Sequence, residues 1–187
     1  FVKNNGGKVA VYKENLYKPM PGYRFIASNT DRSRYYVGEL NGRSSKQAYM
    51  DALHISESNI INQTFHNPLG KMNGQDICII SLKEISGNGL CCYRQVNDSD
   101  VLVLLEEQDY NEILDETLQR IRRDFNHISG VFSINCVFRY LLFSQEHHME
   151  DYLKTMSTLG DHAGLIGFGE HYNQQFVSQT MTCVVFE

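Results

Sequence analysis

The chain has 187 residues, a formal net charge of −5 and 42% hydrophobic residues, which suits one ordinary globular domain or one domain with the tail of another. No run approaches the roughly 18 consecutive apolar residues of a membrane-spanning helix, and no secretory signal is recognisable at the start. Its largest basic cluster, residues 120–123, is too small for the concentrated positive face that nucleic-acid binding needs. We therefore expect a cytoplasmic protein without a membrane span in this stretch, and we expect no nucleic-acid partner.

The cysteine pattern supports the same compartment. The chain has five cysteines, an odd number, and most of them lie within apolar runs. Secreted disulfide scaffolds are shorter and use even numbers of cysteines. We predict buried, reduced thiols.

Residues 1–33 contain turn-forming glycines and prolines at positions 6–7, 19 and 21–22. Such residues interrupt regular structure, so we predict only one short strand here, at residues 8–12. We interpret residues 1–33 as a linker, or as the trailing part of a preceding N-terminal domain in a longer protein.

A strand, a turn and a helix are predicted next. Residues 35–40 have the pattern of a strand, and Asn41-Gly42 is a turn signal. Ser44 and Gln47 have the spacing of a capping box, which predicts a helix over the apolar positions that follow.

The middle of the chain is rich in predicted strands. After a second short helix within residues 56–65, residues 77–85 and 90–96 form two strands of a predicted hairpin, joined through the Gly-rich residues 86–89. Residues 101–105 are continuously apolar, which is typical of a strand that is covered on both faces.

The clearest helix covers residues 110–121, where apolar residues recur every three or four positions, with acidic residues early and arginines late. A strand follows at residues 131–136. Its alternation places Phe132, Ile134 and Cys136 on one face, which we expect to be the buried face.

A helix near residues 149–156, a Gly-rich strand at 163–169 and a final strand within 178–187 complete the prediction. Short paired strands, followed by alternating strands and helices, favour an α+β fold. We predict a mixed, largely antiparallel sheet with helices packed mainly on one face.

Three motifs follow one another in the C-terminal half of the chain: Cys136-Val137-Phe138-Arg139, the run 164–170 that ends in Gly169-Glu170, and Gln179-Thr180-Met181-Thr182. A strand, turn and helix at residues 38–49 and a Pro-Leu-Gly segment at residues 68–70 precede them. In this order, residues 34–187 resemble the C-terminal domain of FIST proteins (F-box and intracellular signal transduction proteins). The family usually has glycine at the position of Phe138 and asparagine at the position of Ser178.

The resemblance implies that residues 34–187 are a FIST C-terminal-like sensory domain, preceded by an N-terminal domain and coupled to an output signalling domain or protein. Small ligands such as amino acids have been proposed for the family. The resemblance therefore implies that the domain recognises a small molecule without turning it over.

Arg139 follows an apolar strand and precedes further apolar residues, an unfavourable setting for an unpaired guanidinium. Its planar fork can hold a carboxylate, and Glu170 can receive an ammonium group. From the residues alone, an internal ion pair, including one between Arg139 and Glu170, is favoured over contact with a ligand, and the family resemblance makes the two comparable. The predicted ligand-binding set is Arg139, Glu170, Gly169, Tyr172, Cys136 and Thr180.

Two alternatives to a ligand-binding module remain open. One is a cysteine-dependent hydrolase or transferase that uses Cys136, activated by the nearby Arg139 cation, together with a histidine, but the predicted core position of the Cys136 thiol argues against catalysis. A protein-interaction domain is the other alternative. His147-His148 fits no metal-ligand motif and no nucleotide-binding fingerprint occurs, so we expect no catalytic residue, no metal site and no cofactor.

Overall fold

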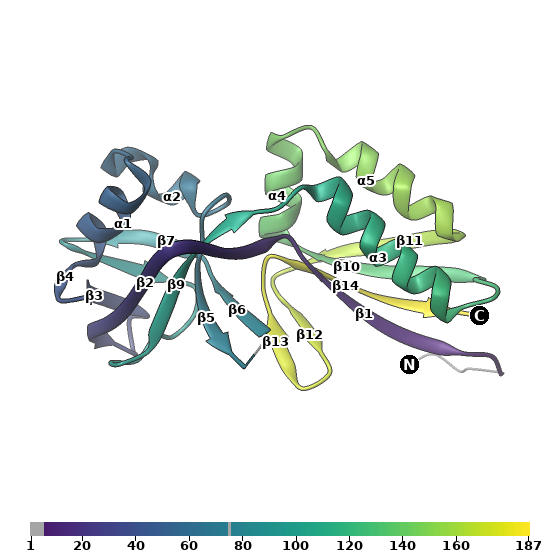
Figure 1. Ribbon diagram of the computed structural model, residues 1–187, viewed down its shortest axis with the longest axis horizontal. Helices are drawn as coiled ribbons and strands as arrows, with labels where there is room; N and C mark the ends of the chain where they lie inside the picture. The colour runs from purple at the N-terminus through teal and green to yellow at the C-terminus, as the bar shows by residue number, and fades with distance from the viewer. Residues whose placement is uncertain (1–5, 75) are drawn as a thin grey trace. The chain divides into compact units, whose positions relative to one another are not determined.

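The computed structural model describes residues 6–74 and 76–187 (Figure 1). It has 28% helix and 45% strand in a mostly antiparallel α+β fold, which confirms the predicted fold class. The chain forms two compact units. We call Tyr17–Glu107 the inserted unit, and Phe1–Leu16 with Gln108–Glu187 the terminal unit.

The inserted unit is built on an eight-stranded sheet with the order β6-β5-β9-β2-β3-β8-β7, in which β4 also pairs with β3. Its helical segments are α1 (Ser45–Leu53), η1 (Glu57–Asn59) and α2 (Ile60–Gln63). Its strands are β2 (Tyr17–Asp31), β3 (Tyr36–Leu40), β4 (Arg43–Ser44), β5 (Leu69–Asn73), β6 (Asp76–Ile80), β7 (Leu82–Ser86), β8 (Gly89–Cys92) and β9 (Val101–Glu107).

Local sequence signals explain the start of α1. Asn41 and Gly42 have φ values of 53° and 70°, the left-handed conformation that a two-residue hairpin turn requires. The Ser44 hydroxyl then accepts a hydrogen bond from the Gln47 backbone N–H at 3.2 Å. This bond satisfies a backbone donor that the first turn of a helix leaves open, as the capping-box spacing predicts.

The predicted boundary at residue 34 differs from the division that the structure shows. Residues 17–31, which we interpreted as linker or as the trailing part of a preceding domain, form the long strand β2. The register of β2 against β9 shifts between Pro19 and Arg24. Because a bulge tolerates proline and glycine within a sheet, these residues bend the strand without ending it.

The hairpin predicted over residues 77–96 is confirmed only for β7 and β8. Residues 76–80 form a separate strand, β6, that pairs with β5. The chain changes partner at Ser81, where the Leu82 N–H donates to the Thr64 hydroxyl at 2.8 Å. Thr64 lies 18 positions before Leu82. The hydrophobic pattern of residues 77–85 does not predict such a contact.

The terminal unit contains a four-stranded sheet with the order β1-β14-β10-β11 and a separate hairpin, β12-β13. Strand β10 is antiparallel to β14 and parallel to β11, so this sheet is mixed. The strands are β1 (Val9–Asn15), β10 (Gly130–Cys136), β11 (Asp161–Gly167), β12 (Glu170–Tyr172), β13 (Gln175–Val177) and β14 (Thr180–Phe186).

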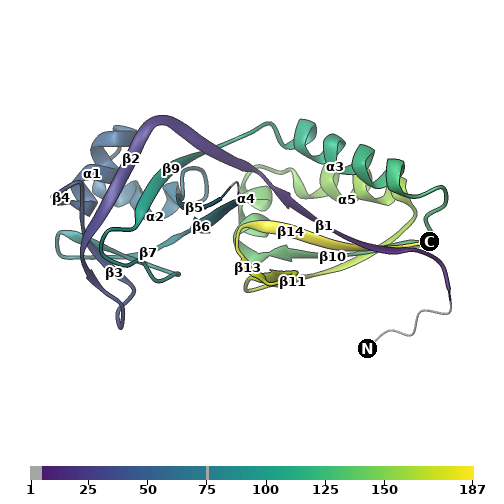
Figure 2. The same ribbon diagram turned by 60° about the horizontal axis from the view of Figure 1, so that its bottom comes forward.

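The helices of this unit lie on one face of its sheet. They are α3 (Tyr110–Asp124), α4 (Val137–Gln145), α5 (Met149–Met156) and the short η2 (Ser157–Leu159). Figures 1 and 2 both show α3 and α5 on the same side of β1, β14 and β10. The helices predicted at residues 110–121 and 149–156 are confirmed, whereas α4 was not predicted.

The predicted buried face of β10 is wrong for Phe132, which is 38% exposed. The side chains that face the helices are Val131, Ser133 and Asn135, all buried. Polar residues occupy this face because the helices and β11 provide them with hydrogen-bond partners, so the hydrophobic alternation of β10 points away from the helices. Cys136 at the end of β10 is nevertheless buried, as predicted.

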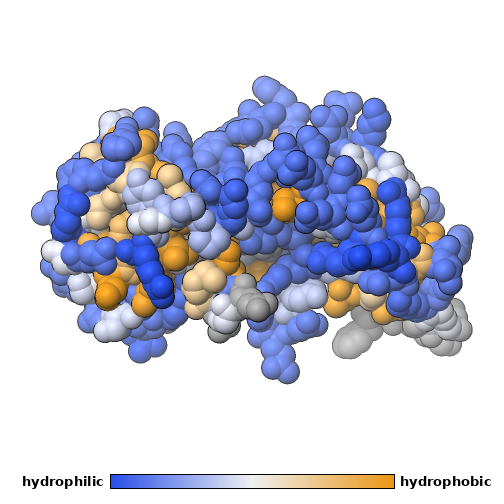
Figure 3. Space-filling model, viewed as in Figure 1, coloured by the Kyte–Doolittle hydropathy of each residue, from blue (hydrophilic) through white to orange (hydrophobic). Residues whose placement is uncertain are grey.

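The surface seen in Figure 3 is predominantly hydrophilic, with hydrophobic residues reaching it in patches. Within the described residues, no helix is long and apolar enough to cross a membrane. All five cysteines are free thiols, and four of them are buried.

Candidate ligand-binding site

Charged and polar side chains from separate elements meet under the helices of the terminal unit. Four of the predicted site residues lie in this cluster, and a fifth residue, Glu14 of β1, joins them. The members are Glu14, Cys136 at the end of β10, Arg139 in the first turn of α4, Glu170 at the start of β12 and Thr180 at the start of β14.

Arg139 is an internal cation. It is 1% exposed, and its Nη2 donates to Glu14 Oε1. The guanidinium carbon lies 4.6 Å from the ring centre of Phe143 and 5.5 Å from that of Tyr152. Ring faces attract a desolvated cation, so the two rings and Glu14 together hold the charge.

The Arg139–Glu14 pair leaves part of its hydrogen-bonding capacity unused. Arg139 Nε and Nη1 and Glu14 Oε2 are buried and have no hydrogen-bond partner among residues 6–74 and 76–187. Buried polar atoms in proteins are nearly always hydrogen-bonded. These two donors and one acceptor are therefore exceptions to the usual pairing of buried polar atoms.

Glu170 is the second buried charge carrier, at 2% exposure. The Thr180 hydroxyl donates to Glu170 Oε2 at 2.7 Å. Burial raises the pKa of the Glu170 carboxyl to about 7, against the opposing effects of Thr180, the Cys136 thiol and the Arg139 charge. Glu170 Oε1 is also without a hydrogen-bond partner in the described part of the chain.

Cys136 has the properties of a core thiol. It is 2% exposed, and burial, followed by the neighbouring Glu170 carboxylate, raises its pKa. A thiol that stays protonated at neutral pH is a poor nucleophile. This environment gives no support to the cysteine-dependent alternative.

Gly169 and Tyr172 belong to the hairpin rather than to the cluster. Gly169 has a φ of 114°, and a Cβ at this position would lie 2.4 Å from the Phe176 ring, so only glycine fits at the entry to β12. Tyr172 is half-buried, and its ring centre lies 5.5 Å from Lys13 Nζ. The structure thus brings Arg139, Cys136, Glu170 and Thr180 together and places Tyr172 against β1.

Glu14 is the site residue that the sequence analysis missed. It lies in the segment that we interpreted as linker, 125 positions before Arg139. Its alternation with the buried Tyr12 gives a weak signal that it faces inward, but no sequence pattern identifies its partner. Arg139 does follow a strand, as expected, but it lies in the first turn of α4, a helix that was not predicted.

A family model described as the FIST C domain matches residues 46–173. The chain belongs to the FIST C domain family. The matched segment contains Cys136, Arg139 and Glu170, and FIST domains are associated with signal transduction. Searches of curated proteins and of solved structures gave no significant match.

Proposed function

We propose that this FIST C domain is a non-catalytic sensory module of a signal-transduction protein. In this proposal it binds a small zwitterionic ligand, such as an amino acid, at the Arg139–Glu170 cluster. Its other partner is an output signalling domain or protein, which reads the ligand-bound state.

The observation that carries the proposal is the complementary set of unfilled hydrogen bonds. Arg139 Nε and Nη1 are unfilled donors of the positively charged guanidinium. Glu170 Oε1 is an unfilled acceptor of a carboxyl group whose pKa is about 7. A zwitterion carries the matching pair: a carboxylate for the guanidinium and an ammonium for the carboxylate. Its binding satisfies buried polar atoms whose unpaired state costs about 1–3 kcal/mol each.

The burial of the cluster makes a conformational response part of the proposal. Because Arg139 and Glu170 are 1% and 2% exposed, the ligand enters only when a neighbouring segment opens. The best candidate for that segment is the β12-β13 hairpin, which carries Glu170 and has three residues in each strand. Two-stranded hairpins are marginal on their own, and a ligand that binds one of two conformations more tightly shifts their populations.

A melting-temperature screen of amino acids and small carboxylates tests this function. A ligand at 100 times its dissociation constant stabilises the folded protein by about 2.7 kcal/mol, which gives a readily measured shift. We expect zwitterionic compounds to raise the melting temperature of the wild type and to lose most of this effect on the Glu170→Gln variant, which keeps the side-chain shape. The matched control is Glu116→Gln, at an exposed glutamate of α3.

Two results would contradict the proposal. One is a screen in which no zwitterion stabilises the wild type. The other is a ligand whose shift is equal in the wild type, Glu170→Gln and Glu116→Gln, since the charge on Glu170 would then have no part in binding.

A further inference from the structure

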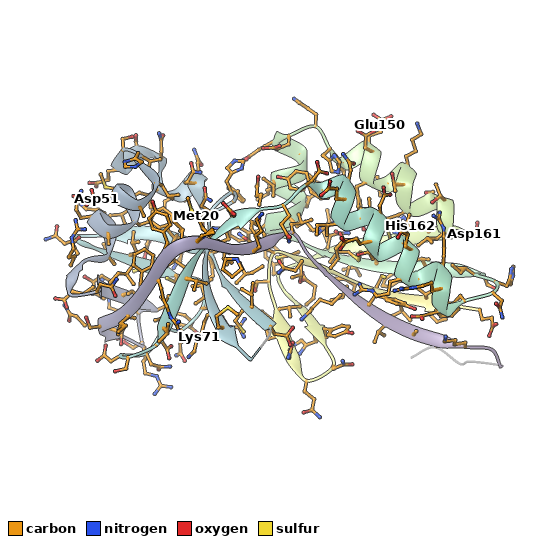
Figure 4. All side chains as sticks on the ribbon, in the orientation of Figure 1. Met20, Asp51, Lys71, Glu150, Asp161 and His162 are labelled. Carbon is orange, nitrogen blue, oxygen red and sulfur yellow. The ribbon has the colours of Figure 1, made fainter. Side chains whose placement is uncertain are left out.

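The terminal unit has a cavity of about 310 Å³ that is lined by residues of α5, β10 and β11. Its lining shares no residue with the predicted ligand-binding set. The polar part of the lining consists of Ser133, Asn135, Tyr140, Tyr152 and His162, and Leu153 of α5 lies among the apolar residues. His162, labelled in Figure 4, follows Asp161 at the start of β11.

Four of the polar residues form one chain of hydrogen bonds. The Asn135 side-chain NH₂ donates to Tyr152 Oη at 3.0 Å, and the Tyr152 hydroxyl donates more weakly to Ser133 Oγ at 3.4 Å. Ser133 Oγ lies 2.8 Å from His162 Nε2. Since an amide NH₂ can only donate, Tyr152 Oη accepts from Asn135, which leaves the Tyr152 hydroxyl hydrogen for Ser133 Oγ. Ser133 Oγ can donate to His162 Nε2 or accept from it, depending on the tautomer of the imidazole.

Burial lowers the pKa of the His162 imidazole, which favours the neutral ring at pH 7. The lining residues that the structure describes include no Asp, Glu, Lys or Arg, so the cavity presents no counter-charge to an ionised ligand.

One acceptor in the wall remains open. Asn135 is 6% exposed, and its Oδ1 is buried without a hydrogen-bond partner among the described residues. This oxygen lies beneath the cavity surface, so a ligand in the cavity can bond to it only when the Asn135 amide group turns toward the cavity. It accepts an N–H or an O–H.

We propose that the cavity binds an uncharged, largely apolar small molecule that carries one N–H or O–H donor. The donor bonds to Asn135 Oδ1, and the apolar body packs against Leu153 and the aromatic side chains of Tyr140 and Tyr152. A volume near 300 Å³ lies at the lower end of the range of small-molecule sites, which fits a bicyclic aromatic compound. This site contains none of the predicted ligand-binding residues, although its Tyr152 ring also contacts the Arg139 guanidinium.

Indole and 1-methylindole are a matched pair of probes, since methylation removes the N–H donor and changes little else. The chain contains no tryptophan, so fluorescence excited at wavelengths beyond the tyrosine absorption band reports on the indole probe alone. We expect indole to bind the wild-type chain at least about tenfold more tightly than 1-methylindole, a factor equal to about 1.4 kcal/mol. In Asn135→Leu, which lacks the acceptor, the two probes should bind with equal affinity.

A second pair of variants keeps the test valid if Asn135→Leu does not fold. Leu153 is 48% exposed on α5 and lines the cavity, whereas Leu141 is 38% exposed on α4 and does not. Leu153→Glu places a charge at the apolar wall and should weaken both probes at least about fivefold. Leu141→Glu, the same change on the neighbouring helix, should leave both affinities unchanged.

The proposal is overturned if neither probe binds the wild type at millimolar concentration, which would leave only water in the cavity. It is also overturned if 1-methylindole binds as tightly as indole, or if Leu141→Glu weakens binding as much as Leu153→Glu. Tighter binding of indole that depends on Asn135 and Leu153, and not on Leu141, supports it.

Discussion

The Glu170 carboxyl group is buried, and burial disfavours its ionised form. Its pKa is raised from 4.5 to about 7, so the folded state binds more protons than the unfolded state between these two pH values. The free energy of unfolding therefore contains a contribution that is fully present below pH 4.5 and is lost as the pH rises to about 7. Thr180 and Arg139 limit this loss, because both favour the ionised form.

The Glu170→Gln variant should remove this pH dependence, since glutamine resembles the protonated carboxyl. We expect the variant to be more stable than the wild type by about 3 kcal/mol at pH 8 and by less than about 1 kcal/mol at pH 5. Urea unfolding at both pH values measures the difference. A gap that stays the same at the two pH values, or one that Glu116→Gln reproduces, would show that the Glu170 carboxyl is not titrating as described.

The buried Arg139–Glu14 pair should behave as a unit. Removing either partner leaves an uncompensated charge inside the protein, so Glu14→Leu or Arg139→Met alone should destabilise by about 3–5 kcal/mol. The double variant should be clearly more stable than the sum of the two losses predicts. A double-mutant cycle in urea measures this coupling, and strict additivity would mean that the ion pair contributes nothing specific.

At the scale of elements, β10 carries its larger hydrophobic side chains on the face away from the helices. We expect Phe132→Ala to cost only about 1 kcal/mol, close to the level of surface changes. Val131→Ala removes two methyl groups from a side chain that is 4% exposed, and should cost about 2 kcal/mol. Equilibrium unfolding of both variants tests this order, and a larger loss for Phe132→Ala would mean that this face of the strand is covered in solution.

The sequence predicted the secondary-structure elements better than it predicted which face of a strand is buried or which residues contact each other. Local signals such as the Ser44 cap and the 110–121 periodicity are complete within a few residues, so they were sufficient for α1 and α3. The face of β10 was mispredicted because Ser133 and Asn135 are buried by virtue of partners on α5 and β11. Helix α4 was missed because its apolar run follows directly on a strand, where periodicity does not separate the two.

The candidate site was also predictable only in part. The order of motifs led to Cys136, Arg139, Glu170 and Thr180, which the fold brings into one cluster. Glu14 was not predictable, because its ion pair with Arg139 spans 125 positions and forms only when β1 pairs with β14 in the folded sheet. Site arrangements of this kind follow from tertiary packing rather than from any local pattern.

At the scale of the whole molecule, the terminal unit depends on both ends of the chain. Strand β1 pairs with β14 from Val9 opposite Phe186 to Asn15 opposite Thr180, and it supplies Glu14. Deletion of residues 1–16 should therefore unfold or loosen residues 108–187, because it removes an entire strand and leaves Arg139 without its partner. The inserted unit, whose sheet lies within Tyr17–Glu107, should stay folded.

Hydrogen exchange followed by peptide mass spectrometry distinguishes the two units in this experiment. We expect peptides from residues 108–187 to lose protection in the deletion variant and peptides from residues 17–107 to keep it. Equal loss in both parts of the chain would show that the two units do not fold separately. Unchanged protection everywhere would show that β1 is dispensable.

The pairing of β1 with β14 also has a consequence for biosynthesis. A ribosome releases β1 early and β14 at the end of this stretch, and the Lys8 backbone N–H reaches the Glu187 carboxylate only across 179 positions. The inserted unit can fold during that interval, as domains generally do during synthesis. Until β14 emerges, β1 presents open backbone groups and the side chain of Tyr12, which is buried in the finished sheet. Such an unpaired strand can pair with another chain, so this interval is when the protein is most exposed to aggregation.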